Sequence, residues 1–348
     1  MWVERDAALQ SFNTLRVPAT TRELVVVQNE RDLAGAFHRV RDGGLPWFVL
    51  GGGSNLVLPL RYEGLVIAMR MRGVRIGIAD AAGVTLVEAA AGESWHGLVR
   101  RCLGAGLAGI ENLALIPGTV GAAPMQNIGA YGAELRDVFE TARVYLPFDE
   151  RFVNMTLAEC AFGYRDSVFR HALRDRAVIT GVTLRLRRDA ATRMHYPDVQ
   201  QELARLGRGA PGAVDIAEAV IRVRRRKLPD VRRYGNVGSF FKNPVIDAVD
   251  AAALVARFPA LRSSTRFDSR GSAKVAAAAL IELAGWKGRV IGRVEVWRRQ
   301  PLVLVNGGGA TGAEVLAVAA TIADDVAAQF GVTPAVEPRI DFGAPATG

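Results

Sequence analysis

The stretch PGTVGAAPMQNIGAYG, Pro117–Gly132, holds four glycines among small residues and follows neither the helical nor the strand period. Gln126, Asn127 and Tyr131 supply its polar groups. A loop with so few bulky side chains lets the backbone lie directly against something large or flat, and the ring system of a flavin would suit it. The alternative is a buried crossing of two chain segments.

A second glycine-rich stretch, GGGSNLVL at residues 51–58, follows an expected strand, where phosphate-binding turns occur. Its three glycines leave backbone N–H groups free to approach an anion, and Ser54 and Asn55 add side-chain donors. Leu56 occupies the third glycine position of a dinucleotide fingerprint, and no lysine followed by serine or threonine makes a P-loop. Taken alone, the stretch predicts either a phosphate-binding turn or a tight structural turn.

The third stretch is GNVGSFFKNP, residues 235–244, with Ser239 in a glycine turn. A nucleophile elbow is excluded because Val237 and Phe241 stand at its two glycine positions. The four histidines, at positions 38, 96, 171 and 195, are scattered and offer no base. Cations of the preceding run IRVRRRKLPDVRRYGN, residues 221–236, favour an anionic substrate beside the serine. The alternative is an ordinary turn serine.

The composition excludes several classes of protein. The chain has 348 residues, half of them hydrophobic and 23% charged, which predicts a soluble protein of two or three domains. No secretory signal is expected at the N-terminus, and the most apolar run, 275–283, is too short to span a membrane. Cys102 and Cys160 stand far apart, so we expect neither a disulfide framework nor a metal site. The net charge of +9 indicates either anionic partners or solubility alone.

Hydrophobic periodicity predicts mixed helices and strands. Strands are expected at 23–28, 45–52 and 65–69 around a helix at 30–43, which makes a β-α-β start. Further strands are expected at 84–92, 142–148, 177–187 and 301–306. Helices are expected at 94–106 with Ser94 as N-cap, 216–228 before Pro229, 271–285, and 311–330 with a capping box of Thr311 and Glu314. These elements predict an α+β protein.

Seven segments together resemble the UDP-N-acetylenolpyruvoylglucosamine reductase (MurB) family over nearly the whole chain. They are SFNTLRVPA, VLGGGSNLV, GIENLALIPGTVGAAPMQNIGAYG, FGYRDSVFR, RKLPD, GNVGSFFKNP and the closing VEP. The resemblance implies a vanillyl-alcohol-oxidase-type FAD-binding fold of two α+β subdomains, residues 1–72 and 73–213. A C-terminal α+β substrate-binding domain would follow at 214–348, with the residues from about 332 returning to the active site.

The resemblance also implies which residues bind the cofactor. No histidine lies in either glycine-rich segment, so FAD is expected to be held without a covalent bond. The implied FAD-binding residues are Gly51, Gly52, Gly53, Ser54, Asn55, Leu56, Pro117, Gly118, Gly121, Ala122, Gln126, Asn127, Gly129, Ala130, Tyr131 and Gly132.

The activity implied by the resemblance is a step of peptidoglycan precursor synthesis. NADPH reduces the flavin, and flavin N5 then passes hydride to the enolpyruvyl ether of UDP-N-acetylglucosamine, giving UDP-N-acetylmuramate after protonation. Ser239 matches the proton donor, Arg165 a carboxylate-binding cation, and Glu337 an acid beside that carboxylate. The residues alone favour a surface ion pair of Arg165 with Asp166 and a solvated charge at Glu337, and the resemblance reverses this preference.

Substrate contacts are implied for Tyr196, in a tyrosine loop of one branch of the family, and for Lys227, Asn243, Lys274 and Gln300 near the uridine diphosphate. The run PAVEP departs from the family's usual leucine-x-proline-glutamate and makes the placement of Glu337 less secure than that of Ser239. We expect a cytoplasmic monomer without nucleic-acid or membrane partners. Two other hypotheses are an FAD-dependent oxidase of the same fold and a nucleic-acid-binding protein built on the basic run.

Overall fold

A computed structural model describes residues 1–207 and 209–342 and begins with a four-stranded sheet of order β1-β2-β4-β3. Its strands are β1 (Trp2–Ala8), β2 (Thr20–Val27), β3 (Trp47–Leu50) and β4 (Arg61–Met69). Helix α1 (Glu30–Gly43) joins β2 to β3, and both strands run parallel to β4, so the expected β-α-β start is confirmed. The Asn29 side chain caps α1 by accepting from the backbone N–H of Asp32.

The second sheet has five strands in the order β10-β9-β11-β6-β5 and is antiparallel throughout. Its strands are β5 (Val74–Ile76), β6 (Val84–Ala90), β9 (Phe139–Leu146), β10 (Arg151–Thr156) and β11 (Val178–Arg187). Two helices, α2 (Trp95–Gly104) and the short α3 (Leu157–Cys160), belong to this part. Ser94 is the N-cap of α2, as predicted.

The long glycine-rich segment crosses this part as a series of short turns. It forms 3-10 helices at Glu111–Leu113, Val120–Ala122, Pro124–Gln126 and Leu135–Asp137, with the small hairpin β7 (Gly129–Ala130) and β8 (Ala133–Glu134). Because glycine and alanine carry little side-chain volume, the backbone can turn several times in a small space.

Helix α5 (Ala213–Lys227) packs against α4 (Pro197–Arg205) and against the core of the second sheet. Ile216 and Val220 of α5 are buried in the same cluster as Leu113 and Leu184. The expected boundary at 213/214 falls at the start of α5 and assigns this helix to the C-terminal domain, whereas its buried side chains pack with the preceding region and its C-terminal end carries the basic run. Pro229 follows α5 closely, as expected.

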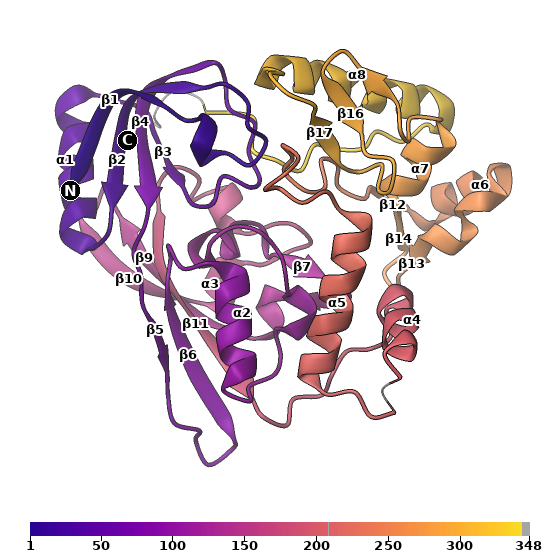
Figure 1. Ribbon diagram of the computed structural model, residues 1–348, viewed down its shortest axis with the longest axis horizontal. Helices are drawn as coiled ribbons and strands as arrows, with labels where there is room; N and C mark the ends of the chain where they lie inside the picture. The colour runs from indigo at the N-terminus through magenta and orange to yellow at the C-terminus, as the bar shows by residue number, and fades with distance from the viewer. Residues whose placement is uncertain (208, 343–348) are drawn as a thin grey trace.

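The C-terminal part contains two small sheets and three helices (Figure 1). The sheets comprise β12 (Val245–Asp247), β14 (Ser272–Val275) and β13 (Thr265–Phe267), and β15 (Val290–Ile291), β16 (Val294–Val296) and β17 (Leu304–Asn306). The helices are α6 (Ala248–Arg257), α7 (Ala277–Leu283) and α8 (Gly312–Phe330). The capping box of Thr311 and Glu314 is confirmed, whereas the single helix predicted over 271–285 is wrong: its first residues form β14, which pairs with β12 and β13.

The first sheet and the C-terminal part share one hydrophobic core. Leu24 and Val66 of the sheet lie in the same buried cluster as Phe240, Leu280 and Ile322. The opposite face of the sheet is covered by α1 and contacts the second sheet through Tyr145. Figure 1 shows the C-terminal part beside the first sheet, with α5 below the C-terminal part. The first sheet, the second sheet with α5, and the C-terminal part are therefore three regions that meet at one junction. Within the described residues, no helix combines the length and the apolar character needed to cross a bilayer.

Candidate active site

A cavity of about 470 Å³ lies where the three regions meet. Its walls come from the first glycine turn, the long glycine-rich segment, the FGYRDSVFR segment, the Ser239 turn and the returning C-terminal chain. Eleven of the sixteen residues expected to hold FAD line it: Gly51, Gly52, Gly53, Ser54, Asn55, Leu56, Pro117, Gly121, Ala122, Gln126 and Gly129. Ser239, Arg165 and Glu337 line the same cavity.

The two glycine-rich segments pack directly against each other. A Cβ added to Gly52 would stand 2.7 Å from the Cα of Gly118, so the two backbones touch at this point. Gly53 has a left-handed φ of 62°, and a Cβ there would lie 2.0 Å from the carbonyl oxygen of Phe12. Part of the glycine content therefore serves a crossing of chain segments, the alternative left open by the sequence, while the same loops also line the cavity.

Five residues of the long segment do not line the cavity: Gly118, Asn127, Ala130, Tyr131 and Gly132. Asn127 is fully buried and uses its amide within the chain. It donates to Glu134 Oε2 and to the Gly163 carbonyl, both at 3.0 Å, and accepts from the Arg136 N–H at 3.0 Å. This side chain fixes the β7-β8 hairpin from outside the cavity.

Ser239 stands in a turn that two other chain segments hold in place. Thr14 donates its hydroxyl to the Asn236 carbonyl at 2.6 Å, while its own backbone N–H donates to the Gly53 carbonyl at 3.0 Å. After the turn, Glu337 N–H donates to the Phe240 carbonyl at 2.9 Å, which brings the C-terminal chain alongside. Among the described residues, none hydrogen-bonds the Ser239 hydroxyl, so the group is free to reach a ligand.

The Arg165 guanidinium lies beside the Glu337 carboxyl group in the cavity wall, with 3.4 Å between Arg165 Nε and Glu337 Oε1. Arg165 also donates to the Gly129 carbonyl at 2.6 Å and has a left-handed φ of 52°, a conformation rare for a residue with a side chain. Glu337 is 8% exposed. Burial raises the pKa of Glu337, and the cations Arg165, Lys242 and Arg170 offset this only in part. The surface alternatives for these two residues are therefore excluded.

Gln126 links the first glycine turn to Glu337. Its Oε1 accepts from Asn55 Nδ2 at 2.6 Å and from Arg170 Nη1 at 3.1 Å, and its Nε2 donates to Glu337 Oε1 at 3.0 Å. The C-terminal chain closes the same wall: Arg339 N–H donates to the Asn55 carbonyl at 3.0 Å, and its guanidinium pairs with Asp175 at 2.7 and 2.8 Å.

Arg224 is a site residue that sequence reasoning counted only as part of the basic run. It projects from α5 into the cavity wall, and its buried Nε has no hydrogen-bond partner among the described residues. Burial lowers the pKa of Arg224, while the neighbouring Tyr131 hydroxyl raises it in part and the Arg165 charge lowers it further. The only signal for Arg224 in the sequence is that it stands three positions before Lys227 on the same helix. How deeply its side chain lies in the cavity wall depends on how α5 packs, which no local pattern indicates.

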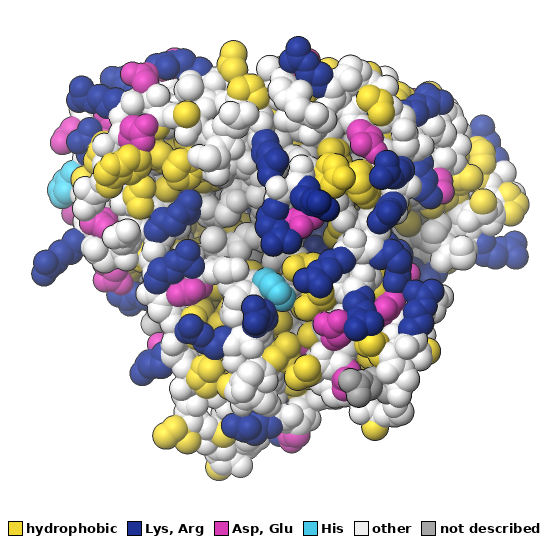
Figure 2. Space-filling view, in the orientation of Figure 1, with side chains coloured by type: hydrophobic (Ala, Val, Ile, Leu, Met, Phe, Trp, Pro, Cys, Tyr) yellow, Lys and Arg dark blue, Asp and Glu magenta, His cyan; other side chains and the backbone are white. Residues whose placement is uncertain are grey.

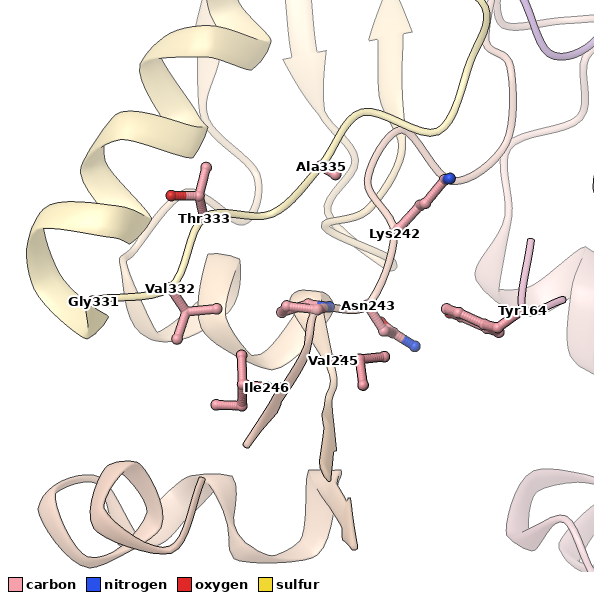
Figure 3. A pocket seen from close by; sticks show the side chains of 10 residues that line it. Tyr164, Lys242, Asn243, Val245, Ile246, Gly331, Val332, Thr333 and Ala335 are labelled. Atoms are coloured by element: carbon pink, nitrogen blue, oxygen red, sulfur yellow. The ribbon is translucent and has the colours of Figure 1, made fainter. Parts of the chain in front are cut away.

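Two of the residues expected to bind the substrate, Asn243 and Lys274, lie beside Tyr164, and Figure 3 shows Asn243 with it. Tyr164 faces Asn243 in a second cavity of about 430 Å³, and Lys274 Nζ lies 3.7 Å from the centre of the Tyr164 ring. The Asn243 side chain accepts from the Ala277 N–H at 3.0 Å. Since Tyr164 precedes Arg165 in the chain, these groups lie next to the Arg165 side of the main cavity.

The other three expected substrate residues lie near the C-terminal end of α5. Lys227 Nζ pairs with Asp198 Oδ2 at 2.6 Å, and the Lys227 carbonyl accepts from Trp297 Nε1 at 3.0 Å. Gln300 follows in the same turn as Trp297, and its buried Oε1 has no partner among the described residues. Tyr196 is 43% exposed and packs edge-on against Tyr131, with 5.2 Å between ring centres. None of the five expected substrate residues lines the main cavity itself.

The cavity fits a flavin dinucleotide. Trp47, Val49, Trp95 and Ile116 give part of it an apolar wall, and the glycine turns give backbone groups that a phosphate can approach. Five arginines and three acidic residues line it, which leaves a positive balance. Lys and Arg side chains also gather over the middle of the face in Figure 2, at the junction of the regions. No histidine or cysteine lines the cavity within the described chain, so no side chain there offers the usual covalent attachment.

The fold and the cavity define a flavoprotein, and comparison with known proteins supports this class. Residues 22–154 match the family model described as FAD binding domain, and residues 230–340 match the C-terminal domain of UDP-N-acetylenolpyruvoylglucosamine reductase. A MurB crystal structure from Thermus caldophilus superposes with a TM-score of 0.66 at 24% identity, covering 98% of this chain and 99% of that one. The expected α+β FAD-binding fold is thus confirmed.

Curated sequences then give the family. The chain is 49% identical to UDP-N-acetylenolpyruvoylglucosamine reductase of Ralstonia nicotianae over 334 residues, covering 95% of this chain and 97% of the relative. It is 46% identical to the Pseudomonas aeruginosa protein of that name over 338 residues, covering 97% and 98%. The chain belongs to the UDP-N-acetylenolpyruvoylglucosamine reductase family.

Proposed function

We propose that this chain uses NADPH to reduce the enolpyruvyl group of UDP-N-acetylglucosamine enolpyruvate to UDP-N-acetylmuramate, for peptidoglycan precursor synthesis. The observation that carries the proposal is the meeting of Ser239, Arg165 and Glu337 in one cavity with the flavin-binding turns. These three residues come from distant parts of the chain, and only folding brings them to one cavity.

The proposed cofactor is non-covalent FAD, bound along residues 51–56 and by Pro117, Gly121, Ala122, Gln126 and Gly129. When bound, the flavin supplies a carrier that accepts a hydride from NADPH and gives it to the terminal carbon of the substrate. The chain's own contribution is to exclude water and to hold the two reactants in sequence at one place.

Arg165 and Arg224 bind the substrate carboxylate in this proposal. Addition of hydride to the terminal carbon places negative charge on the neighbouring carbon and, by resonance, on the carboxylate. Two guanidinium groups in a buried site stabilise that charge more in the transition state than in the ground state. Burial raises the pKa of Glu337, and in its protonated form this residue donates a hydrogen bond to the same carboxylate.

Ser239 donates the proton that completes the reaction. Its hydroxyl is free of hydrogen bonds within the described chain and is held by a turn fixed through Thr14. Serine is a weak acid, but the carbanionic intermediate is a strong base, so the transfer is downhill when nearby cations stabilise the alkoxide. The alkoxide then recovers a proton from solvent.

The proposed contacts with the uridine diphosphate are Lys227, Lys274, Asn243 and Gln300, with Tyr196 closing over the nucleotide. Gln300 Oε1 has no hydrogen-bond partner among the described residues, and as an acceptor it suits a hydroxyl or N–H of the nucleoside and not a phosphate oxygen. Lys227 would exchange its Asp198 partner for a phosphate, which is electrostatically favourable because the diphosphate carries more charge.

We further propose that the enzyme works as a cytoplasmic monomer without nucleic-acid or membrane partners. One chain supplies every group of the proposed site, which supports a monomer. Sedimentation equilibrium at several protein concentrations tests this: one mass equal to the chain mass is expected, and a concentration-dependent rise would contradict it.

Flavin release and NADPH consumption test the whole proposal. Purified protein should carry a flavin that denaturation releases, and it should consume NADPH only when the enolpyruvyl substrate is present. Colourless protein, or NADPH oxidation that depends on oxygen and not on this substrate, would overturn the proposal.

A further inference from the structure

We propose that Gln126 is a positioning residue that decides which oxygen of Glu337 carries the acid proton. The contacts of Gln126 on both sides of its amide fix the Glu337 oxygen Oε1 as an acceptor, so the proton resides on Oε2. The consequence for catalysis rests on the proposed function, whereas the hydrogen-bond arrangement does not.

The orientation of the Gln126 amide follows from its neighbours. Arg170 Nη1 lies 3.1 Å from Gln126 Oε1, and a guanidinium can only donate. The atom of Gln126 that faces Arg170 must therefore be the oxygen, and the same oxygen accepts from Asn55 at 2.6 Å. A flipped amide would set N–H groups against the N–H groups of Arg170.

The amide nitrogen consequently faces Glu337. Gln126 Nε2 lies 3.0 Å from Glu337 Oε1 and must donate to it, because an amide NH₂ has no lone pair to accept with. Arg165 Nε lies 3.4 Å from the same oxygen and places positive charge beside it. With the Gln126 N–H donating to Oε1 and the Arg165 guanidinium next to it, a proton on that oxygen would face both groups, and a protonated Glu337 places its hydrogen on Oε2.

This arrangement connects the flavin-binding turn to the acid. Asn55 belongs to the first glycine turn and lines the cavity, so its amide, Gln126 and Glu337 form a three-membered chain of hydrogen bonds. The charged groups that act on Glu337 are Arg165, Lys242 and Arg170, and the neutral phenol of Tyr164, whose pKa burial raises, lies nearby. Within the described chain, Gln126 is the side chain that hydrogen-bonds the Glu337 carboxyl group and so holds it in a fixed direction.

A stability measurement tests the hydrogen bond without any substrate. The folded-state pKa of Glu337 is raised above its unfolded value, so ionisation destabilises the fold as pH rises from about 4.5, and the loss levels off at the folded pKa. Because glutamine does not ionise, Glu337→Gln should have a higher Tm than its parent protein, and the difference should grow as pH rises through that range. The comparison is made in the flavin-loaded protein in four backgrounds: unchanged, Gln126→Leu, Gln126→Glu and, as a control, the exposed Gln329→Leu.

Removal of the Gln126 donor should raise the pKa of Glu337 further. In the Gln126→Leu background the pH-dependent gain from Glu337→Gln should be larger and should level off at higher pH. Gln126→Glu should enlarge it as well, because two carboxyl groups then face each other. Gln329→Leu should leave it unchanged. Equal pH-dependent gains in all four backgrounds would overturn the proposal.

A kinetic measurement tests the consequence. In Gln126→Leu, reoxidation of the reduced enzyme by the enolpyruvyl substrate should slow roughly 10- to 100-fold, the cost of a hydrogen bond to an ionisable group. In this variant the fall of the reoxidation rate at alkaline pH should begin at a higher pH. In Gln126→Glu the reoxidation rate should recover partly at acid pH. A slowing by one factor at every pH would show a merely structural role. If unchanged protein fails to turn over this substrate, the proposed function fails, and the Tm series still decides the role of Gln126.

Discussion

At the scale of single residues, the Ser239 hydroxyl is the group on which the chemistry depends. Ser239→Ala should leave the fold and the reduction of the flavin by NADPH intact, because the hydroxyl makes no hydrogen bond to the described chain. Reoxidation by the enolpyruvyl substrate should fall by several orders of magnitude, as for other removed catalytic groups. Rapid mixing under nitrogen measures both steps, with the exposed Ser263→Ala as the matched control. Loss of flavin reduction in Ser239→Ala would instead indicate a role in cofactor binding.

Arg224 gives a second prediction at this scale. Among the described residues Arg224 has no carboxylate partner and its buried Nε has no hydrogen bond, which costs folding free energy, so Arg224→Met should keep or raise the Tm of the substrate-free protein. The same change should weaken apparent substrate affinity by roughly 10-fold or more, because a charged hydrogen bond is lost. Thermal unfolding and steady-state kinetics report the two effects. A lower Tm with unchanged substrate affinity would show that Arg224 serves the fold.

At the scale of elements, Thr14 joins the first glycine turn to the Ser239 turn. Thr14→Val keeps the shape of the side chain and removes the hydroxyl bond of 2.6 Å to the Asn236 carbonyl. The free energy of unfolding should fall by about 1–2 kcal/mol, since a partly buried carbonyl loses its donor. Thr14→Ser is the control and should restore most of it. Urea unfolding measures the difference, and equal stability of the valine variant would refute the link.

Helices α2 and α3 carry the two cysteines, and both thiols are buried. Burial raises the pKa of Cys102 and of Cys160 to about 12 each. The thiolate is the reactive form, so neither should react with a disulfide reagent between pH 7 and pH 9 while the protein is folded. Spectrophotometric thiol titration should find both groups only after urea is added. Rapid labelling of the folded protein would show that one of these helices opens.

At the scale of the whole molecule, the parts that sequence could predict are those with local signals. Helix α2 follows its Ser94 cap and α8 follows its Thr311–Glu314 box, because such caps act within a single turn. Residues 272–275 were expected to be helical, yet they form β14. The segment pairs with β12 on one side and with β13 on the other, and this pairing outweighs the local preference. The bond from Gln126 to Glu337 spans 211 positions, so no local pattern could indicate it.

The candidate site shows the same division. Resemblance supplied Ser239, Arg165 and Glu337, while the depth of Arg224 depends on how α5 packs against the second sheet. The two glycine-rich segments were expected to face a ligand, and they also touch each other at Gly52 and Gly118, a contact that only the folded chain defines.

The proposed reaction passes hydride from the flavin of this cavity to an enolpyruvyl sugar nucleotide. To measure this step, the purified protein is reduced with one equivalent of NADPH under nitrogen, and UDP-N-acetylglucosamine enolpyruvate is then added. The oxidised flavin spectrum should return within the time of enzymatic turnover, with UDP-N-acetylmuramate formed in equal amount. A flavin that stays reduced until oxygen is admitted would refute the proposed reaction and favour an oxidase.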